Sequence, residues 1–179
     1  MTDIELEQFI TEYGGDIYSF CCCLTGSRQE ADDLYQETFL RAIEKKQILD
    51  AEGNPKSYLL SVAIRLWKNQ RRKRAWRKRI AGMDETGNEM AGTDLQAGSE
   101  TSPEHQAVRK EMQTAVRNAV DRLPDKMKVT VLLYYMEERS VEQIADILRI
   151  PCGTVKSRLH QARKILEKEL EYVLNELQI

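Results

Sequence analysis

The chain has 179 residues, of which 41% are hydrophobic, 7% aromatic and 31% charged, and its formal net charge is −2. This length allows one ordinary domain or two small ones, and many charged residues with few aromatics favour a helical protein. No run approaches the roughly 18 consecutive apolar residues of a membrane helix, and the acidic start MTDIELEQ is unlike a signal peptide. We therefore expect a cytoplasmic protein without direct membrane insertion.

Charge is distributed unevenly along the chain. Residues 1–50 carry 4 basic and 11 acidic residues, whereas residues 51–83 carry 10 basic residues and 1 acidic residue. Residues 84–105 carry 6 acidic residues and no basic one. This separation predicts an acidic surface for a protein partner and a basic surface for a polyanion.

The first two predicted helices cover residues 3–24 and 28–46. Gly14 and Gly15 weaken the first helix by about 1 kcal/mol each relative to alanine. The second helix has regular apolar spacing on one face and acidic residues on the other. Leu40 lies on that polar face, where it is either an isolated exposed leucine or an anchor for a partner.

Four cysteines occur, at Cys21, Cys22, Cys23 and Cys152. Three consecutive helical residues point to different sides, so the first three do not form a metal-ligand cluster by themselves. We expect them to pack as small apolar groups, and we assign no disulfide and no metal site.

A third helix is predicted over residues 55–80, with Asn54 as its cap and Pro55 in its first position. Its first half is apolar over a broad arc. Its second half, RLWKNQRRKRAWRKR, carries cations in all directions, with Trp67 and Trp76 among them. The solvated end of a long helix is one interpretation. Nucleic-acid binding is the favoured one, because cations neutralise phosphates and aromatic faces accept unstacked bases.

Residues 81–105 are rich in glycine, serine, threonine and acidic residues and show no periodicity, which is typical of a linker. The predicted fold is all-α, with two small helical domains joined by a flexible acidic linker. The N-terminal domain covers residues 1–80 and the C-terminal domain residues 106–179. Helix resumes from Pro103, turns at residues 123–125, and a further helix ends at residues 137–139.

A helix-turn-helix is predicted between Ser140 and Leu166. Ser140 and Gln143 have capping-box spacing at the start of its first helix, Val141–Leu148. Proline and glycine within residues 149–153 stop that helix and restart the chain. The second helix is expected to bury four residues and to continue towards the C-terminus; these are Val155, Leu159, Ala162 and Leu166.

The outer face of the second helix carries no acidic residue between Gly153 and Leu166. It presents serine, histidine and glutamine, which can hydrogen-bond base edges, beside lysine and arginine, which suit phosphate. An unspecified helical hairpin would also have one polar face, but a merely solvated helix usually mixes charges of both signs. The pattern therefore favours a helix that reads the DNA major groove.

Three segments carry motifs that occur together in one family. They are EADDLYQETFLRAI, with D-L-x-Q-x-x-F spacing at Asp33, Leu34, Gln36 and Phe39; PKSYLLSVAIRLWKNQRRKR; and LPDKMKVTVLLYYMEERSVEQIADILRIPCGTVKSRLHQARKIL. Together they resemble the bacterial sigma factors, and the chain length and two-region layout resemble the extracytoplasmic-function (ECF) group. The run GTVKSRLHQAR is the most specific piece.

The resemblance implies a promoter-specificity subunit of RNA polymerase that catalyses no covalent step and needs no cofactor or small-molecule substrate. Its implied partners are core RNA polymerase, promoter DNA and an anti-sigma factor. Asp33, Gln36, Glu37, Leu40 and Arg41 would bind core polymerase. Lys56, Tyr58, Arg65, Lys68, Asn69 and Arg72 would bind the minus-ten element. At the minus-thirty-five element, Ser157, His160 and Gln161 would read bases, and Thr154, Lys156, Arg158 and Arg163 would hold phosphates.

Two residues of the turn depart from the family pattern. Arg149 stands where the family usually has glycine, and a positive φ there would cost on the order of 1 kcal/mol. Pro151 stands where the family often has a capping serine.

Three other classes of protein stay open on the residues alone. A dimeric transcription regulator would need a sensor or receiver domain, which residues 1–80 do not resemble. A small helical enzyme would need a nucleophile and base, but the chain has only two histidines, His105 and His160. The third class is an adaptor that binds protein only.

Overall fold

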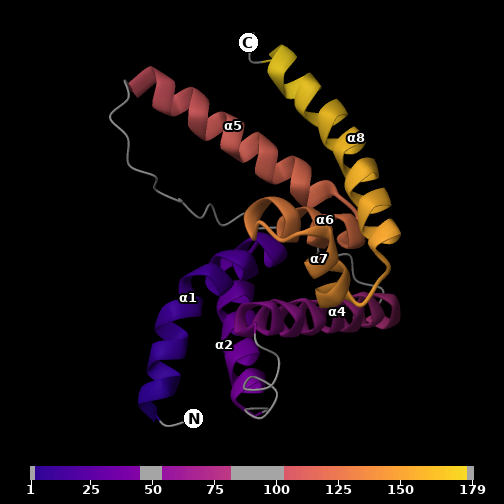
Figure 1. Ribbon diagram of the computed structural model, residues 1–179. Coiled ribbons are helices and arrows are strands. Elements are labelled where there is room, and N and C mark those ends of the chain that lie inside the picture. The colour runs from indigo at the N-terminus through magenta and orange to yellow at the C-terminus, as the bar shows by residue number, and fades with distance from the viewer. Residues whose placement is uncertain (1–2, 45–53, 82–102, 177–179) are drawn as a thin grey trace. The chain divides into compact units, whose positions relative to one another are not determined.

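The computed structural model describes residues 3–44, 54–81 and 103–176, and every regular element within these ranges is a helix (Figure 1). The chain divides into two compact units, Met1–Thr93 and Asp94–Ile179. The predicted all-α fold with two helical domains is therefore confirmed. Most of the predicted linker, residues 82–102, lies outside the described residues.

The first unit is a bundle of three helices: α1 (Asp3–Thr25), α2 (Arg28–Glu44) and α4 (Pro55–Ala81). Each of them packs against the other two. Their apolar faces meet in a core whose largest fully buried side chains include Phe20, Ile17, Leu24, Leu34, Leu59 and Leu60. The apolar spacing that predicted these helices therefore also placed their inner faces correctly.

Aromatic side chains join α1 to α2. The rings of Tyr18 and Tyr35 meet edge to face with centroids 5.6 Å apart, and Tyr35 contacts Phe39 at 4.9 Å. The Tyr18 hydroxyl also donates a 2.7 Å hydrogen bond to the carboxylate of Asp32. Helix α1 runs unbroken through Gly14 and Gly15. Gly14 is buried, and because it has no side chain the Tyr35 hydroxyl can approach the helix closely.

The cysteines of α1 pack as predicted. Cys21 is buried in the core, and Cys22 and Cys23 are half-buried. Burial raises the pKa of the Cys21 thiol from 9.0 to about 12. Among the described residues, no group of three or more potential metal ligands comes together.

Helix α4 begins as the sequence predicts and changes character halfway along. The side-chain oxygen of Asn54 accepts a 3.1 Å hydrogen bond from the backbone N–H of Ser57, which caps the helix. Core residues occur up to Trp67, whereas every side chain from Arg71 to Ile80 is exposed. The second half of α4 is therefore a surface helix.

The second unit contains α5 (Pro103–Arg122), α6 (Asp125–Val131), η1 (Leu132–Met136), α7 (Val141–Leu148) and α8 (Cys152–Glu176). Because α5 starts at Pro103, the last three residues of the predicted linker are helical. The core includes Leu133, Ile144, Val155 and Leu159. The buried ammonium of Lys128 donates to the carboxylate of Asp121 at 2.7 Å, which compensates its charge.

The single helix predicted to end at residues 137–139 is in fact two elements. After α6, residues 132–136 form a π-helix, in which the N–H of Glu137 donates to the carbonyl of Leu132 at 3.1 Å. This wider turn has no signature in the apolar spacing. Glu138 then adopts a positive φ of 50° and leads the chain towards α7.

The predicted capping box of α7 is confirmed. The Ser140 hydroxyl accepts from the N–H of Gln143 at 3.2 Å, and the Gln143 side chain accepts from the N–H of Ser140 at 3.0 Å. At the other end, Arg149 has φ 53° and ψ 53°. The N–H of Ile150 donates to the carbonyl of Ala145 at 3.0 Å, and that of Arg149 to Asp146 at 3.3 Å. This is the Schellman pattern, with arginine at the position that glycine usually takes.

Helix α8 starts earlier than predicted. Pro151 precedes it directly, and its carbonyl accepts from the N–H groups of Thr154 and Val155 at 2.9 and 3.2 Å. Gly153, expected to lie in the break, is inside the first turn of α8 because proline restarts the helix at once. Val155 and Leu159 are buried as predicted, whereas Leu166 is only half-buried.

Candidate nucleic-acid interface

A groove of about 630 Å³ lies between α2 and α4 in the first unit. Its walls mix carboxylates, amides, cations and two leucines. The lining residues are Asp33, Gln36, Glu37, Leu40, Arg41, Leu66, Asn69, Gln70, Arg72 and Lys73. All five residues that the sequence assigned to polymerase binding therefore line one groove.

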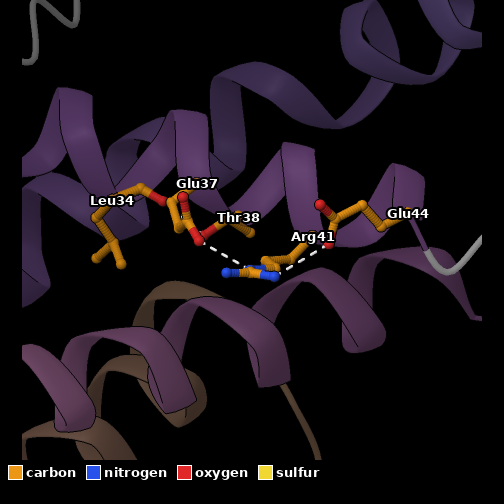
Figure 2. A network of polar contacts seen from close by, with 5 residues as sticks. All are labelled: Leu34, Glu37, Thr38, Arg41 and Glu44. Carbon is orange, nitrogen blue, oxygen red and sulfur yellow. Dashed lines mark hydrogen bonds and ion pairs between the residues drawn. The ribbon is translucent and has the colours of Figure 1, made fainter.

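The α2 wall of the groove is an outward face distinct from the core. Leu40 is 59% exposed. The Arg41 guanidinium donates to Glu37 at 2.8 Å and to Glu44 at 3.1 Å (Figure 2). The hydrogen bond with Glu37, and then the attraction of the two carboxylates, raise the pKa of Arg41. On the inner face, buried Thr38 donates to a backbone carbonyl of its own helix.

The α4 wall brings together two sets that the sequence analysis kept apart. Asn69 and Arg72, predicted to contact the minus-ten element, line the same groove as the polymerase-binding set. Arg72 donates to the Asn69 side chain at 3.1 Å. Leu66, Gln70 and Lys73 were missed; their helical spacing at the edge of the apolar arc was the available signal.

The six residues predicted for the minus-ten element do not share one surface. Arg65 and Lys68 are exposed, like Asn69 and Arg72, and these four recur at helical spacing on the side of α4 away from the core. Lys56 lies nine residues before Arg65, about two and a half turns, and therefore points to the opposite side.

The first turn of α4 is engaged within the bundle. Lys56 forms an ion pair with Asp16 of α1. Tyr58 is half-buried and its hydroxyl oxygen is inaccessible to solvent. The structure therefore separates these two predicted residues from the exposed cationic face.

The basic end of α4 keeps two of its cations in internal contacts. Arg74 donates to Glu30 of α2 at 2.6 Å, and the Arg71 guanidinium lies 5.3 Å from the ring centroid of Trp67. Trp76 and Ile80 are large apolar side chains exposed to solvent in this segment. An exposed aromatic among cations is the arrangement that the sequence interpretation required for nucleic acid.

In the second unit, α8 presents the predicted polar face. Lys156, Ser157, His160 and Gln161 are exposed, and buried Val155, Leu159 and Ala162 hold the helix against the core. Thr154 and Arg158 are half-buried on the flank. The Ser157 hydroxyl donates to the carbonyl of Thr154 at 3.0 Å, which leaves its lone pairs available as acceptors.

Arg163 has partners that the sequence analysis missed. Its Nε donates to the hydroxyl of Tyr135 in η1 at 2.8 Å. The guanidinium also lies 5.7 Å from the ring centroid of Tyr134 and 5.9 Å from that of Tyr135. The hydrogen bond with Tyr135 is the main cause that raises the pKa of Arg163. A local sequence pattern cannot predict this contact, because Arg163 and Tyr135 are 28 residues apart in the chain.

Comparison with known proteins now identifies the family. The family described as Sigma-70 region 2 matches residues 9–77, and the family described as Sigma-70, region 4 matches residues 113–166. The chain is 33% identical over 164 residues to the ECF RNA polymerase sigma factor SigW of Bacillus subtilis, covering 88% of this chain and 84% of that protein. The chain belongs to the ECF sigma factors of RNA polymerase.

Two further proteins are similar to this chain. The sigma factor is 29% identical over 148 residues to the RNA polymerase sigma-H factor of Pseudomonas aeruginosa, covering 83% of this chain and 77% of that protein. Its fold resembles the sigma factor RpoE of Bartonella quintana, solved in complex with the anti-sigma factor NepR. That likeness has a TM-score of 0.73 at 21% identity and covers 93% of this chain and 97% of RpoE.

The family gives the two surfaces their context. As an ECF sigma factor, the protein directs core RNA polymerase to specific promoters and assists transcription initiation. The region 2 match contains the groove between α2 and α4, and the region 4 match contains the helix-turn-helix. Sigma factors are specificity subunits and not a family of enzymes. Within the described residues of this sigma factor, no helix is long and apolar enough to cross a membrane.

Proposed function

We propose that the first unit of this ECF sigma factor docks on core RNA polymerase through the groove between α2 and α4. In this proposal, the exposed face of α4 binds the minus-ten element and α8 reads the minus-thirty-five element. One observation supports it most. All five predicted polymerase contacts line one groove, and the opposite wall of that groove carries Arg72 and Lys73 of α4. We keep the predicted domains at residues 1–80 and 106–179, joined by the linker.

Leu40 is the proposed anchor of polymerase docking. It is a large exposed apolar side chain surrounded by Asp33, Gln36, Glu37 and Arg41. Binding hot spots commonly consist of one desolvated anchor within a polar rim that excludes water. The acidic members of the rim suit a basic partner surface, which favours fast and correctly oriented association.

The proposed minus-ten surface lies mainly on Arg65, Lys68, Asn69 and Arg72. All four are exposed on α4, and the last two also line the polymerase groove. Docking on polymerase would therefore place the DNA contacts at the edge of the protein interface. Lys56 and Tyr58 complete the proposed set, but Lys56 reaches phosphate only after it leaves Asp16. Single-stranded bases captured on this face would favour promoter opening without fuel.

At the minus-thirty-five element, α8 would lie in the major groove. Ser157, His160 and Gln161 would contact base edges, and Thr154, Lys156, Arg158 and Arg163 would fix the helix on the phosphates. Each good base contact contributes about 1–3 kcal/mol of discrimination. Two modest DNA contacts on one chain, both engaged at one promoter, gain affinity from their linkage.

We also propose a protein inhibitor as a partner. RpoE of Bartonella quintana, which shares the fold, was solved with an anti-sigma factor. The groove with its exposed leucine is a surface that such an inhibitor would cover.

We place the protein in the cytoplasm, because its proposed partners, polymerase and promoter DNA, are there. We propose no cofactor.

The experiment that tests this function is transcription in vitro with purified core polymerase on a library of genomic fragments. We expect transcripts from a small set of fragments that share two elements, and no such transcripts from core polymerase alone. A footprint of a dimer on a palindrome, formed without polymerase, would instead support an ordinary transcription regulator. Absence of promoter binding at every salt concentration, even with polymerase, would support a protein-only adaptor.

A further inference from the structure

We propose that Tyr135 and Arg163 together form a binding site for one phosphodiester group of the promoter backbone. The inference rests on the proposed function of α8 and deepens it. Arg163 was expected to hold a phosphate on its own, whereas Tyr135 lies in η1, before the helix-turn-helix, and had no role. The two residues would act as one site because the hydrogen bond between them uses one donor of the guanidinium and none of the phenol.

The hydrogen bond between the two residues uses only one of the five N–H donors of the guanidinium. Arg163 uses Nε to donate to the Tyr135 hydroxyl at 2.8 Å. The two terminal Nη groups, which form the planar fork that matches phosphate, take no part in that hydrogen bond. Tyr134 makes a weaker contact with the same guanidinium. A phenol that accepts a hydrogen bond still has its own O–H to donate. One phosphate group could therefore accept from the guanidinium and from the phenol at once.

The two tyrosine rings hold the guanidinium in place. They meet edge to face with centroids 4.9 Å apart and planes at 77°. The guanidinium lies over both, at 5.7 Å from Tyr134 and 5.9 Å from Tyr135. An arginine held in this way loses less side-chain freedom when it binds an anion, so that pre-organisation favours binding.

The π-helix explains how neighbouring tyrosines reach one side chain of α8. Within η1, Leu132 and Leu133 are buried, Tyr134 is half-buried and Tyr135 is 54% exposed. The widened turn thus keeps two leucines in the core while the next two side chains extend towards α8. Single π-turns inside helical segments occur often at functional sites.

The charge around the pair suits an anion. From Cys152 to Leu166, α8 carries four basic residues and no acidic residue. Lys164 is exposed directly beside Arg163 in sequence, and the proposed base-reading residue His160 lies one turn earlier on α8. Glu167 is the first carboxylate along α8 after this stretch. A tyrosine and arginine pair also occurs in protein interfaces, but its continuity with the base-reading face favours DNA backbone.

The test measures promoter binding by the full chain assembled with core polymerase, as a function of salt concentration. Removing a phosphate contact lowers the slope of log K against log salt by about 0.9. We expect Arg163→Ala to lower the slope by that amount. Tyr135→Phe should weaken binding about 3- to 10-fold with an unchanged slope, because the cation remains while the hydroxyl is lost. The double variant should lose less than the sum of the two single losses, since the two residues are hydrogen-bonded to each other and serve one phosphate.

A promoter series with one neutral methylphosphonate linkage at a time locates the site. At one position the wild type should lose affinity, whereas Arg163→Ala should lose nothing further. Lys164→Ala is the matched control, and its loss should map to a different linkage. Tyr135→Phe should keep the wild-type melting temperature and the wild-type order of promoter preference.

Two outcomes separate this inference from the proposed function. If the wild type binds its promoter and Tyr135→Phe binds equally well at every salt concentration, the tyrosine is no part of a phosphate site. Additive losses in the double variant would overturn the shared site as well. If the wild type with polymerase binds no promoter at all, the proposed function itself fails.

Discussion

The Nε of Arg41 lies 2.8 Å from a carboxylate oxygen of Glu37, one turn earlier on the exposed face of α2. The same guanidinium reaches Glu44 on the other side, so two carboxylates orient one cation (Figure 2). Exposed pairs of this kind contribute little to folding stability. Their consequence is geometric: they hold a charged rim next to Leu40.

Leu40→Ala should weaken binding to core polymerase about 10- to 30-fold, because hot-spot anchors contribute roughly 2 kcal/mol or more. The melting temperature should stay unchanged, since the side chain is 59% exposed in the free protein. Titration of labelled core polymerase measures the affinity. Ile80→Ala is the matched control, an exposed apolar residue of α4 outside the groove. Equal losses for both variants, or none for Leu40→Ala, would refute the anchor.

Gln161→Ala should change which promoters are used, not merely how tightly they are bound. A side chain that reads a base edge contributes about 1–3 kcal/mol of discrimination at one base pair. We therefore expect preference at one position of the minus-thirty-five element to relax about 10-fold in a randomised-promoter selection. Lys156→Ala, which removes an exposed cation from the same helix, should weaken all sequences evenly. An unchanged preference in the Gln161 variant would show that the reading face lies elsewhere.

Local signals in the sequence predicted what depends on neighbours along one helix. The capping box of Ser140 and Gln143 follows from a three-residue spacing, and the exposed face of α8 from its buried stripe. At Arg149 the family pattern raised the question of a positive φ, and the structure shows one of 53°.

What the sequence could not supply depends on how helices pack. The contact between Arg163 and Tyr135 spans 28 residues and needs the π-turn of η1, which no periodicity encodes. Likewise, Asn69 and Arg72 share a groove with α2 only because α2 and α4 pack side by side. The family resemblance grouped Lys56 with them, but its position on the opposite side of α4 pairs it with Asp16.

Gly14→Ala should destabilise the first unit by about 1 kcal/mol despite alanine's better helix propensity. A Cβ on Gly14 would lie 2.8 Å from the Tyr35 hydroxyl oxygen, and that ring is fixed by Tyr18 and Phe39. Overpacking costs about 1–3 kcal/mol, which outweighs the roughly 1 kcal/mol gained by removing a helical glycine. Denaturant unfolding measures the change.

Gly15 provides the matched control for this substitution, because nothing lies within 4 Å of its Cβ position. Gly15→Ala should therefore stabilise the unit by about 0.5–1 kcal/mol. Adding Tyr35→Phe to Gly14→Ala removes the clashing oxygen and should recover part of the loss. A stabilising effect of Gly14→Ala alone would mean that the tyrosine moves aside freely.

Cys21 should resist alkylation at pH 8 until the protein unfolds, whereas exposed Cys152 should react at once. Burial raises the pKa of Cys21 to about 12, so the reactive thiolate is scarce in the folded state. Burial of the neutral thiol therefore contributes to the stability of the folded state in full below pH 9. This contribution is lost as the pH rises towards 12. Mass spectrometry of labelled peptides reads each site. Rapid labelling of Cys21 under native conditions would contradict its burial.

Arg149→Gly should raise the free energy of unfolding of the second unit by about 1 kcal/mol. Arg149 holds φ 53° at the end of α7, a left-handed conformation that costs a residue with a Cβ roughly 1–2 kcal/mol and glycine almost nothing. The greater freedom of glycine in the unfolded chain offsets part of this gain. Arg149→Ala separates the causes, because it keeps the backbone strain and removes only the guanidinium. Equal stability of the glycine and alanine variants would show that the turn stores no strain.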